Sequence, residues 1–346
     1  MRAMSFAAIC VLGFAAAFPA LAADDDYYRG KTVIAYVGYN AGGTNDIVTR
    51  IVAQHIGKHM GGNPSVIVKN MPGAGSRTLA GYLYNKAPKD GTEFGNIDRA
   101  VTTEALLDPS VRNPFEILDF TWVGTPSQEA LLCVTWHTSQ VKTLKDMMAR
   151  ETIIASPGSA SGEALSAQVL NATIGTRIRA IAGYPGGAEM NLAMQRGEVD
   201  GRCGIGWGAV KATSMQWIRD KELNILLQTA TERHPDLAEV PTSYELVKNA
   251  ADRRALEVIY ANQRLGRPFI APPNMPTDRK TALRRAFDAT MKDEGFIADA
   301  AKQNIDLQPL TGEQMERTLG DAYDLPPSIL ARAQELVKAP QEAKQR

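Results

Sequence analysis

The chain has 346 residues, with 38 Lys and Arg against 38 Asp and Glu, and 44% of its residues are hydrophobic. A formal charge of zero predicts no broad basic face, which argues against nucleic acid as a partner. The length is more than one hydrophobic core usually serves, so we expect two domains.

Residues 1–22 have the layout of a secretory signal peptide. Arg2 precedes an apolar stretch, which ends in Ala20-Leu21-Ala22 ahead of Ala23. This stretch is short for a membrane span. We therefore expect an exported protein. Removal of Arg2 lowers the basic count from 38 to 37 against 38 acids, which leaves a charge of −1.

Apolar runs and amphipathic segments alternate along the first two thirds of the chain. Strands are expected at 33–37, 65–70, 120–125, 131–136, 152–156, 177–184, 199–206 and 223–230, and helices after Gly43 and at 77–87, 162–174 and 188–197. This alternation predicts parallel α/β units. From about Asp252 the chain is mostly helical, with long helices expected near 277–304 and 312–338.

Four glycine-rich junctions follow predicted strands, at 39–46, 70–77, 156–163 and 184–189. Each presents backbone N–H groups at the positive end of a helix dipole, where an anion is stabilised by roughly 0.3–1 kcal/mol per terminus. The lysine of a phosphate-binding P-loop is missing, which favours a carboxylate as the anion. Ordinary strand-to-helix turns are the alternative interpretation of each junction taken alone.

The chain also resembles a known family, the Bug-type (Bordetella uptake gene) periplasmic solute receptors of tripartite tricarboxylate transporters. The resemblance runs from about Tyr27 to Lys338. It is carried by "GKTVIAYVGYNAGGTNDIVTR", "NPSVIVKNMPGAGS", "APKDGT", "GYPGGAEMNLAMQRGEVDG" and "ERHPDLAEVPT".

The resemblance implies a type II periplasmic-binding-protein fold, in which two α/β lobes joined by a hinge close on a small carboxylate. Lobe 1 is expected at 23–128 and 226–346, and lobe 2 at 129–225. The first two loops would grip one carboxylate, and the second two would contact the distal part of the ligand. The expected ligand-binding residues are Tyr39, Asn40, Ala41, Gly42, Gly43, Thr44, Asp46, Asn70, Gly73, Ala74, Gly75, Ser76, Ser156, Gly158, Ser161, Tyr184, Gly186 and Gly187.

The implied function is capture of a di-, tri- or aromatic carboxylate and its delivery to the membrane subunits of a tripartite tricarboxylate transporter, by a monomer. A periplasmic sensor that docks on a membrane signalling protein shares this fold and is the alternative. No serine has the G-x-S-x-G context of a hydrolase. We expect no enzymatic activity, no cofactor and no metal.

Several residues allow two interpretations. Asp46 either braces its loop or contacts the ligand, and Arg77 either pairs with a carboxylate or faces solvent. Trp207 either lines the cleft or packs. His55 and His59 stand four residues apart, but they lack the glutamate of H-E-x-x-H, which argues against zinc.

The two cysteines of the mature chain also have two interpretations. In a type II lobe, the strand at 131–136 lies antiparallel to the strand that contains Cys203. Cys133 and Cys203 could then form a disulfide, or both could be unpaired core residues.

Overall fold

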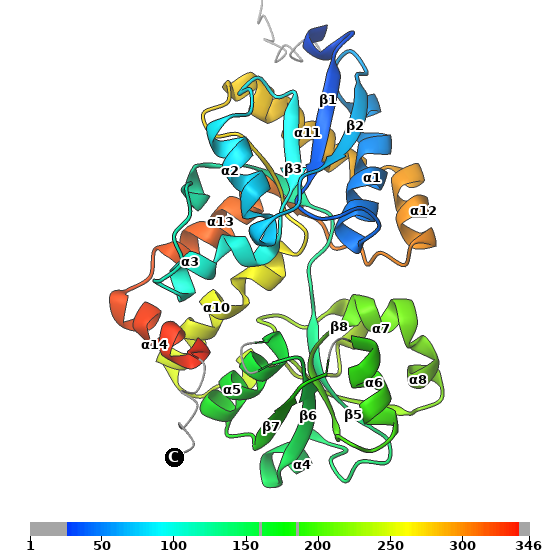
Figure 1. Cartoon of the computed structure of the whole chain (residues 1–346), viewed down its shortest axis with the longest axis vertical. Coiled ribbons are helices and arrows are strands. Elements are labelled where there is room, and N and C mark those ends of the chain that lie inside the picture. Colours follow the sequence, from blue (N-terminus) through cyan, green and yellow to red (C-terminus); the bar gives the residue numbers. More distant parts are fainter. Residues whose placement is uncertain (1–25, 159–160, 185–186, 339–346) are drawn as a thin grey trace, which may run out of the picture.

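The structure is a computed structural model that describes residues 26–158, 161–184 and 187–338. Two α/β lobes follow one another along the long axis (Figure 1), each built on its own sheet. The predicted two-lobe α/β fold is confirmed. The predicted signal peptide, 1–22, lies outside the described residues.

The first lobe contains a sheet of six strands in the order β11-β4-β10-β3-β1-β2. Strand β1 pairs in parallel with β2 and β3, whereas β10 and β11 pair antiparallel with their neighbours. The strands are β1 Thr32–Val37, β2 Ser65–Asn70, β3 Glu93–Asn96, β4 Thr121–Thr125, β10 Phe269–Ala271 and β11 Leu310–Thr311. Exposure alternates along the edge strand β2, and the more central β3 is buried throughout, as expected from their places in the sheet.

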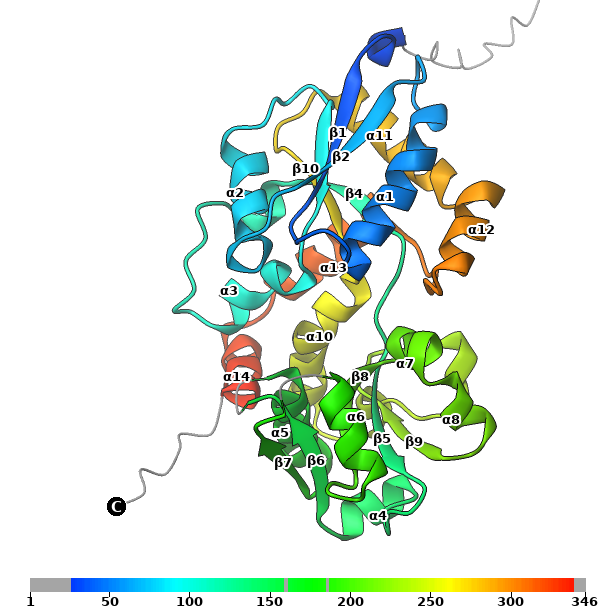
Figure 2. The same cartoon turned by 45° about the vertical axis from the view of Figure 1, so that its right-hand side comes forward.

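The helices beside this first sheet come from both ends of the sequence (Figures 1 and 2). They are α1 Thr44–Ile56, α2 Arg77–Asn85, α3 Glu104–Leu107, α11 Thr277–Thr290, α12 Glu294–Lys302 and α13 Gly312–Tyr323. The short 3₁₀ helices of this lobe are η1 Asp26–Tyr28, η2 Gly57–His59, η3 Ala74–Ser76, η4 Arg99–Thr102 and η5 Ile117–Asp119, whereas η6 Pro235–Leu237 packs in the second lobe.

The second lobe contains a sheet of five strands in the order β7-β6-β8-β5-β9. Its strands are β5 Leu131–Trp136, β6 Thr152–Ser156, β7 Ile178–Ala182, β8 Gly201–Gly206 and β9 Leu223–Gln228. Its helices are α4 Leu144–Ala149, α5 Gly162–Ile174, α6 Gly187–Gln195, α7 Trp207–Thr213, α8 Met215–Arg219 and α9 Ser243–Leu246. The antiparallel strands β5 and β8 place Cys133 opposite Cys203, and a disulfide joins the two.

The C-terminal helices connect the lobes. Residues of α10 (Ala250–Leu265) and α14 (Pro327–Val337) belong to the same hydrophobic cluster as residues of the second lobe. Figure 2 shows α14 beside α10 and near α5, in agreement with the contacts between these helices. The predicted lobe limits near 128 and 225 remain a proposal, and position 225 falls inside β9 of the second sheet.

The expectation of two long C-terminal helices is wrong, because each is interrupted. Asp293 has an extended backbone, and its carboxylate accepts a hydrogen bond from the Phe296 N–H, so α12 begins as a separate helix. The second break comes before α14, where Pro326 and Pro327 lack the N–H groups that would continue α13.

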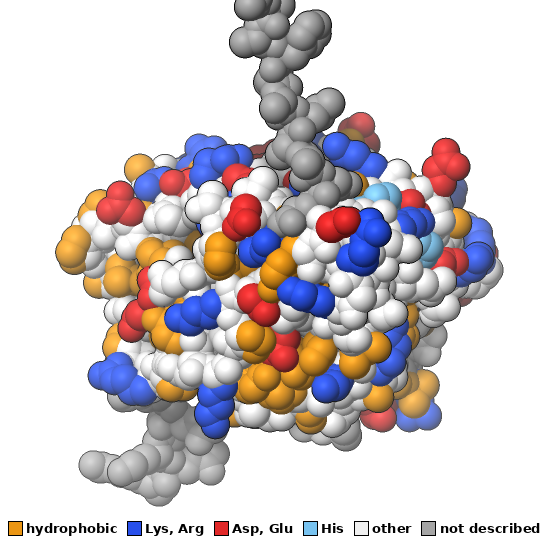
Figure 3. All heavy atoms as spheres, turned by 90° about the horizontal axis from the view of Figure 1, so that it is seen from above, with side chains coloured by type: hydrophobic (Ala, Val, Ile, Leu, Met, Phe, Trp, Pro, Cys, Tyr) orange, Lys and Arg blue, Asp and Glu red, His pale blue; other side chains and the backbone are white. Residues whose placement is uncertain are grey.

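Seen from above, basic and acidic side chains are interspersed over the visible surface (Figure 3), in keeping with a formal charge of zero. Within the described ranges, no helix is both long enough and apolar enough to cross a membrane.

Candidate functional site

A cavity of about 480 Å³ lies between the lobes. Its walls come from the loop before α1, from the segment after β3, from α10 and from the start of α5. The lining residues are Tyr39, Gly43, Thr44, Asn45, Asp98, Arg99, Ala100, Leu131, Gly162, Leu165, Ser166, Val169, Ile259, Tyr260, Asn262, Gln263, Gly266 and Arg267. Thr44, Arg99, Leu131 and Arg267 also line a neighbouring cavity of about 290 Å³. The two cavities therefore form one cleft.

The N-terminus of α1 opens into this cleft. Gly43, Thr44 and Asn45 line it, and the N-cap residue Gly43 supplies no side-chain hydrogen bond to the first turn. The first N–H groups of a helix have no intrahelical partner and carry its positive partial charge. In contrast, the Ser161 hydroxyl caps α5 by accepting from the Ala164 N–H at 3.3 Å. The α1 terminus is therefore the better anion site of the two.

Asp46 is buried and braces the first loop. Its carboxylate accepts hydrogen bonds from the Gly42 N–H, the Arg50 guanidinium and the Asn70 amide, all at 2.9 Å. The Asn70 amide also donates to the Tyr39 carbonyl at 2.9 Å. The hydrogen bond from Arg50 contributes most to lowering the pKa of Asp46, which falls to about 2. Asp46 and Asn70 hold the backbone of the loop in place.

Tyr39 and Ser76 make hydrogen bonds that fix the two glycine-rich loops of the first lobe, 39–46 and 70–77. Tyr39 and Asp98 both line the cavity, and the Tyr39 hydroxyl donates a hydrogen bond to the Asp98 carboxylate. Burial is the largest cause that raises the pKa of Tyr39 well above its ordinary value, and the Asp98 charge is the next. Ser76 is buried and donates to the Gly38 carbonyl at 3.0 Å. Arg77 pairs with Glu104 of α3 and donates to the Ala74 carbonyl at 3.2 Å, so its described contacts are with other residues of the first lobe.

The predicted residues fall into three groups. Tyr39, Gly43 and Thr44 line the main cavity. The others among the described residues are not among its lining residues: Asn40, Ala41, Gly42, Asp46, Asn70, Gly73, Ala74, Gly75, Ser76, Ser156, Gly158, Ser161, Tyr184 and Gly187. Gly186 lies outside the described residues. Ligand contact by these loops stays a prediction.

In the second lobe, hydrogen bonds link the predicted residues to one another. The Ser156 hydroxyl lies 2.8 Å from the Ser161 hydroxyl and donates to the Gly158 carbonyl at 2.7 Å. The Gly187 carbonyl accepts from Arg202, a buried arginine that also donates to Asn191 at 2.7 Å. Tyr184 is half-buried and packs against the core of this lobe.

The sequence analysis missed five charged residues of the cleft: Asp98, Arg99, Glu129, Arg267 and Asp306. Arg99 could have been found, because it follows β3, whose end lies beside that of β1. Arg267 stands between α10 and β10, far along the chain from every glycine-rich junction, and no local pattern marks it. The fold brings it to the cleft.

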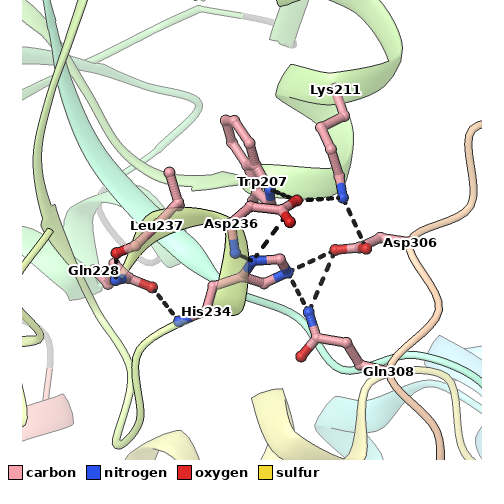
Figure 4. Close-up of polar contacts among 8 residues, drawn as sticks. All are labelled: Trp207, Lys211, Gln228, His234, Asp236, Leu237, Asp306 and Gln308. Carbon is pink, nitrogen blue, oxygen red and sulfur yellow. Dashed lines mark hydrogen bonds and ion pairs between the residues drawn. The ribbon is translucent and has the colours of Figure 1, made fainter. Parts of the chain in front are cut away.

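Of the two interpretations of Trp207, the structure shows the packed one. The side chain also belongs to a polar cluster that joins the lobes (Figure 4). It is 5% exposed, and its indole N–H donates to Asp236 at 3.0 Å. Lys211 Nζ lies 2.9 Å from Asp236 Oδ2 and 2.7 Å from Asp306 Oδ1. His234 Nε2 lies 2.7 Å from Asp306 Oδ2.

These three groups, His234, Asp236 and Asp306, have the spacing of metal ligands. However, the Lys211 ammonium already lies between the two carboxylates, so the cluster favours a polar bridge over a metal site. His55 and His59 likewise pair with acids, Asp299 and Asp293, at the contact between α1 and α12.

Comparisons with known proteins identify the family of this chain. The family model described as "Tripartite tricarboxylate transporter family receptor" matches residues 48–328. The UPF0065 protein in the TAR-I ttuE-ttuC' intergenic region of Agrobacterium vitis is 27% identical over 296 residues, which cover 84% of this chain and 80% of that protein.

Solved structures share the fold. A TctC solute-binding protein from Polaromonas, with no ligand, superposes with a TM-score of 0.69 at 17% identity, over 90% of this chain and 99% of that one. Rpa4515 of R. palustris, with adipate, gives a TM-score of 0.58 at 21% identity, over 90% and 97%. With two lobes around a cleft and a family match over most of its length, the chain belongs to the receptor family of tripartite tricarboxylate transporters.

Proposed function

We propose that this protein is an extracytoplasmic receptor that captures a small carboxylate between its lobes and delivers it to the membrane subunits of a tripartite tricarboxylate transporter. It would act as a periplasmic monomer without enzymatic activity. The ligand carboxylate would bind to the N–H groups at the start of α1, with Tyr39 and Arg99 beside it.

The observation that carries this proposal is the uncapped N-terminus of α1 in the wall of an inter-lobe cavity. A helix terminus with free N–H groups stabilises an anion without a lysine. The cavity volume, about 480 Å³, lies within the range of small-molecule sites, roughly 300–1,000 Å³. The adipate in the related Rpa4515 structure supports a carboxylate as the ligand class.

A thermal-shift screen of mono-, di-, tri- and aromatic carboxylates tests the proposal, followed by calorimetry on each acid that stabilises the protein. The primary amide of a binding acid should bind about 100-fold more weakly or worse, because charge-assisted hydrogen bonds are roughly twice as strong as neutral ones. Equal affinity for acid and amide would argue against the α1 site. A panel without any binding acid would overturn the proposed ligand class.

A further inference from the structure

Two arginines of the first lobe approach the same carboxylate oxygen in the cleft. Arg99 Nη1 lies 3.3 Å from Glu129 Oε2, and Arg267 Nη2 lies 3.8 Å from that oxygen. Arg99 begins the 3₁₀ helix after β3, and Arg267 lies between α10 and β10. Both arginines line both cavities.

These contacts use little of the binding capacity of the two guanidinium groups. Each guanidinium has five N–H donors, and a strong N–H···O⁻ bond is about 2.7–2.9 Å long. Between described residues, the Arg99 side chain makes one hydrogen bond, to Glu129, and the Arg267 side chain makes one, to the Ser127 hydroxyl at 2.9 Å. Most of their N–H groups remain available to an acid.

Glu129 lies on the segment that crosses between the lobes, and it is held close to the second lobe. Its N–H donates to the Gln263 carbonyl at 2.9 Å, and its side chain is 12% exposed. Its Oε1 lies against Gly206 at the end of β8, where a Cβ atom would come within 2.3 Å of that oxygen. Gly206 thus leaves room for the carboxylate, which is a single anion shared by two cations.

We propose that Arg99 and Arg267 form a subsite for a second acid group of the ligand, and that Glu129 occupies it while the cleft is empty. This inference rests on the proposed function. Thr44 lines the same two cavities as the arginines, so one ligand can reach both the α1 terminus and the arginine pair. The receptor would therefore select diacids over monoacids of the same length.

The roles of the three residues predict opposite effects of substitution. Glu129→Gln keeps the shape of the side chain but removes the negative charge that competes with the ligand for the two arginines. Diacids should therefore bind this variant about tenfold more tightly, since charge-assisted hydrogen bonds are the strong ones. Arg267→Gln and Arg99→Gln should each weaken diacid binding by about tenfold or more for the same reason. Arg267→Lys should fall between, because lysine keeps the charge without the planar fork.

The experiment is calorimetry with two matched pairs, adipate with hexanoate and succinate with butyrate. At least one diacid should bind wild-type protein about tenfold or more tightly than its monoacid, in line with one added charge-assisted contact. Arg267→Gln should abolish this preference and leave monoacid affinity within about threefold, whereas Arg99→Gln should weaken both acids, because Arg99 also lies beside the α1 terminus. Arg179→Gln is the control, because Arg179 is exposed on β7 and pairs with Glu151 outside the cleft. Circular dichroism and thermal melting establish that each variant folds.

The outcomes separate this inference from the proposed function. Two results would overturn the subsite and leave the receptor function standing. In the first, acids bind wild-type protein, but monoacids bind as tightly as diacids. In the second, the arginine and Glu129 variants bind diacids as wild-type protein does. If none of the carboxylates in the wider screen binds, both proposals fall.

Discussion

At the residue scale, the polar side chains of the first loops mainly hold backbone in place. Asp46, Asn70 and Ser76 direct their hydrogen bonds at loop N–H groups, loop carbonyls and one another. A grip built from backbone N–H groups requires this arrangement, because main-chain donors point correctly only while the loop keeps its shape. The side chains that reach the cleft are others, such as Tyr39 and Arg99.

The Asp46→Asn substitution should lower the free energy of unfolding by about 1.5 to 3 kcal/mol, the usual range for hydrogen bonds to charged groups. An asparagine at this position is neutral, so its hydrogen bonds with Gly42, Arg50 and Asn70 would lack the negative charge that strengthens those of Asp46. Chemical denaturation measures the change. Asp26→Asn is the control, since Asp26 is exposed and pairs only with Arg29 in the described contacts. Equal losses in both variants would contradict the bracing role.

The lowered pKa of Asp46 also predicts a pH dependence. Because the pKa falls from 3.8 to about 2 on folding, the charge of Asp46 stabilises the fold above its unfolded pKa. That contribution should be lost as the pH falls from about 4 towards 2. The difference in unfolding free energy between wild type and Asp46→Asn should therefore shrink in acid. A difference that stays constant from pH 7 to pH 3 would contradict the prediction.

Two glycines of the binding loops have backbone conformations that valine resists. Gly42 has φ +90°, and Gly73 has φ +138°, where a Cβ atom would clash with the Thr78 hydroxyl oxygen at 2.5 Å. Gly42→Val or Gly73→Val should abolish ligand binding and keep most of the secondary structure, because β-branched residues are strained at positive φ. Circular dichroism beside a binding isotherm measures both effects. Unchanged affinity in both variants would show that these loops do not form the site.

At the scale of elements, the second lobe is held by a covalent link between strands. The β5–β8 pair lies inside the five-stranded sheet, and its disulfide closes a loop with a sequence separation of 70 residues. Cys133 and Cys203 are both fully buried. A cross-link in this position limits the unfolded chain more than the folded one.

We expect exported protein to carry this disulfide, which should stabilise it by roughly 4 kcal/mol in the chain-entropy model. Alkylation under denaturing conditions without reductant, followed by intact-mass analysis, should add no alkyl group. Prior reduction should allow two additions and lower the melting temperature. Two additions without reductant would show free thiols and rule the disulfide out.

At the scale of the whole molecule, contacts beside the cleft join the two lobes. Asp306, which precedes β11 of the first sheet, binds Lys211 of α7 and His234, which follows β9 (Figure 4). Burial alone would raise the pKa of Asp306, but the hydrogen bonds from His234 and Lys211 outweigh it and lower the pKa to about 2. This bridge favours the observed approach of the lobes.

Asp306→Asn should let the two lobes move further apart, because it removes the negative charge that Lys211 and His234 share. Small-angle scattering of ligand-free protein should give a larger radius of gyration for Asp306→Asn than for wild type. Asp236→Asn is the matched control: it disturbs Trp207 and Lys211 within the second lobe but leaves the link to Asp306. Identical scattering from wild type and Asp306→Asn would contradict the role of the bridge.

By itself, the sequence determined the α/β alternation and the glycine-rich loops that follow the strands. These features are local: the hydrophobic periodicity of its residues encodes α1, and the cap residue Ser161 marks the start of α5. The tertiary structure alone decided which charges meet in the cleft. Arg99, Glu129 and Arg267 are separated by 30 to more than 130 positions, and only the crossing of the chain between the lobes brings them together. Contacts of this kind depend on packing across distant segments, for which a single sequence carries no periodic signal.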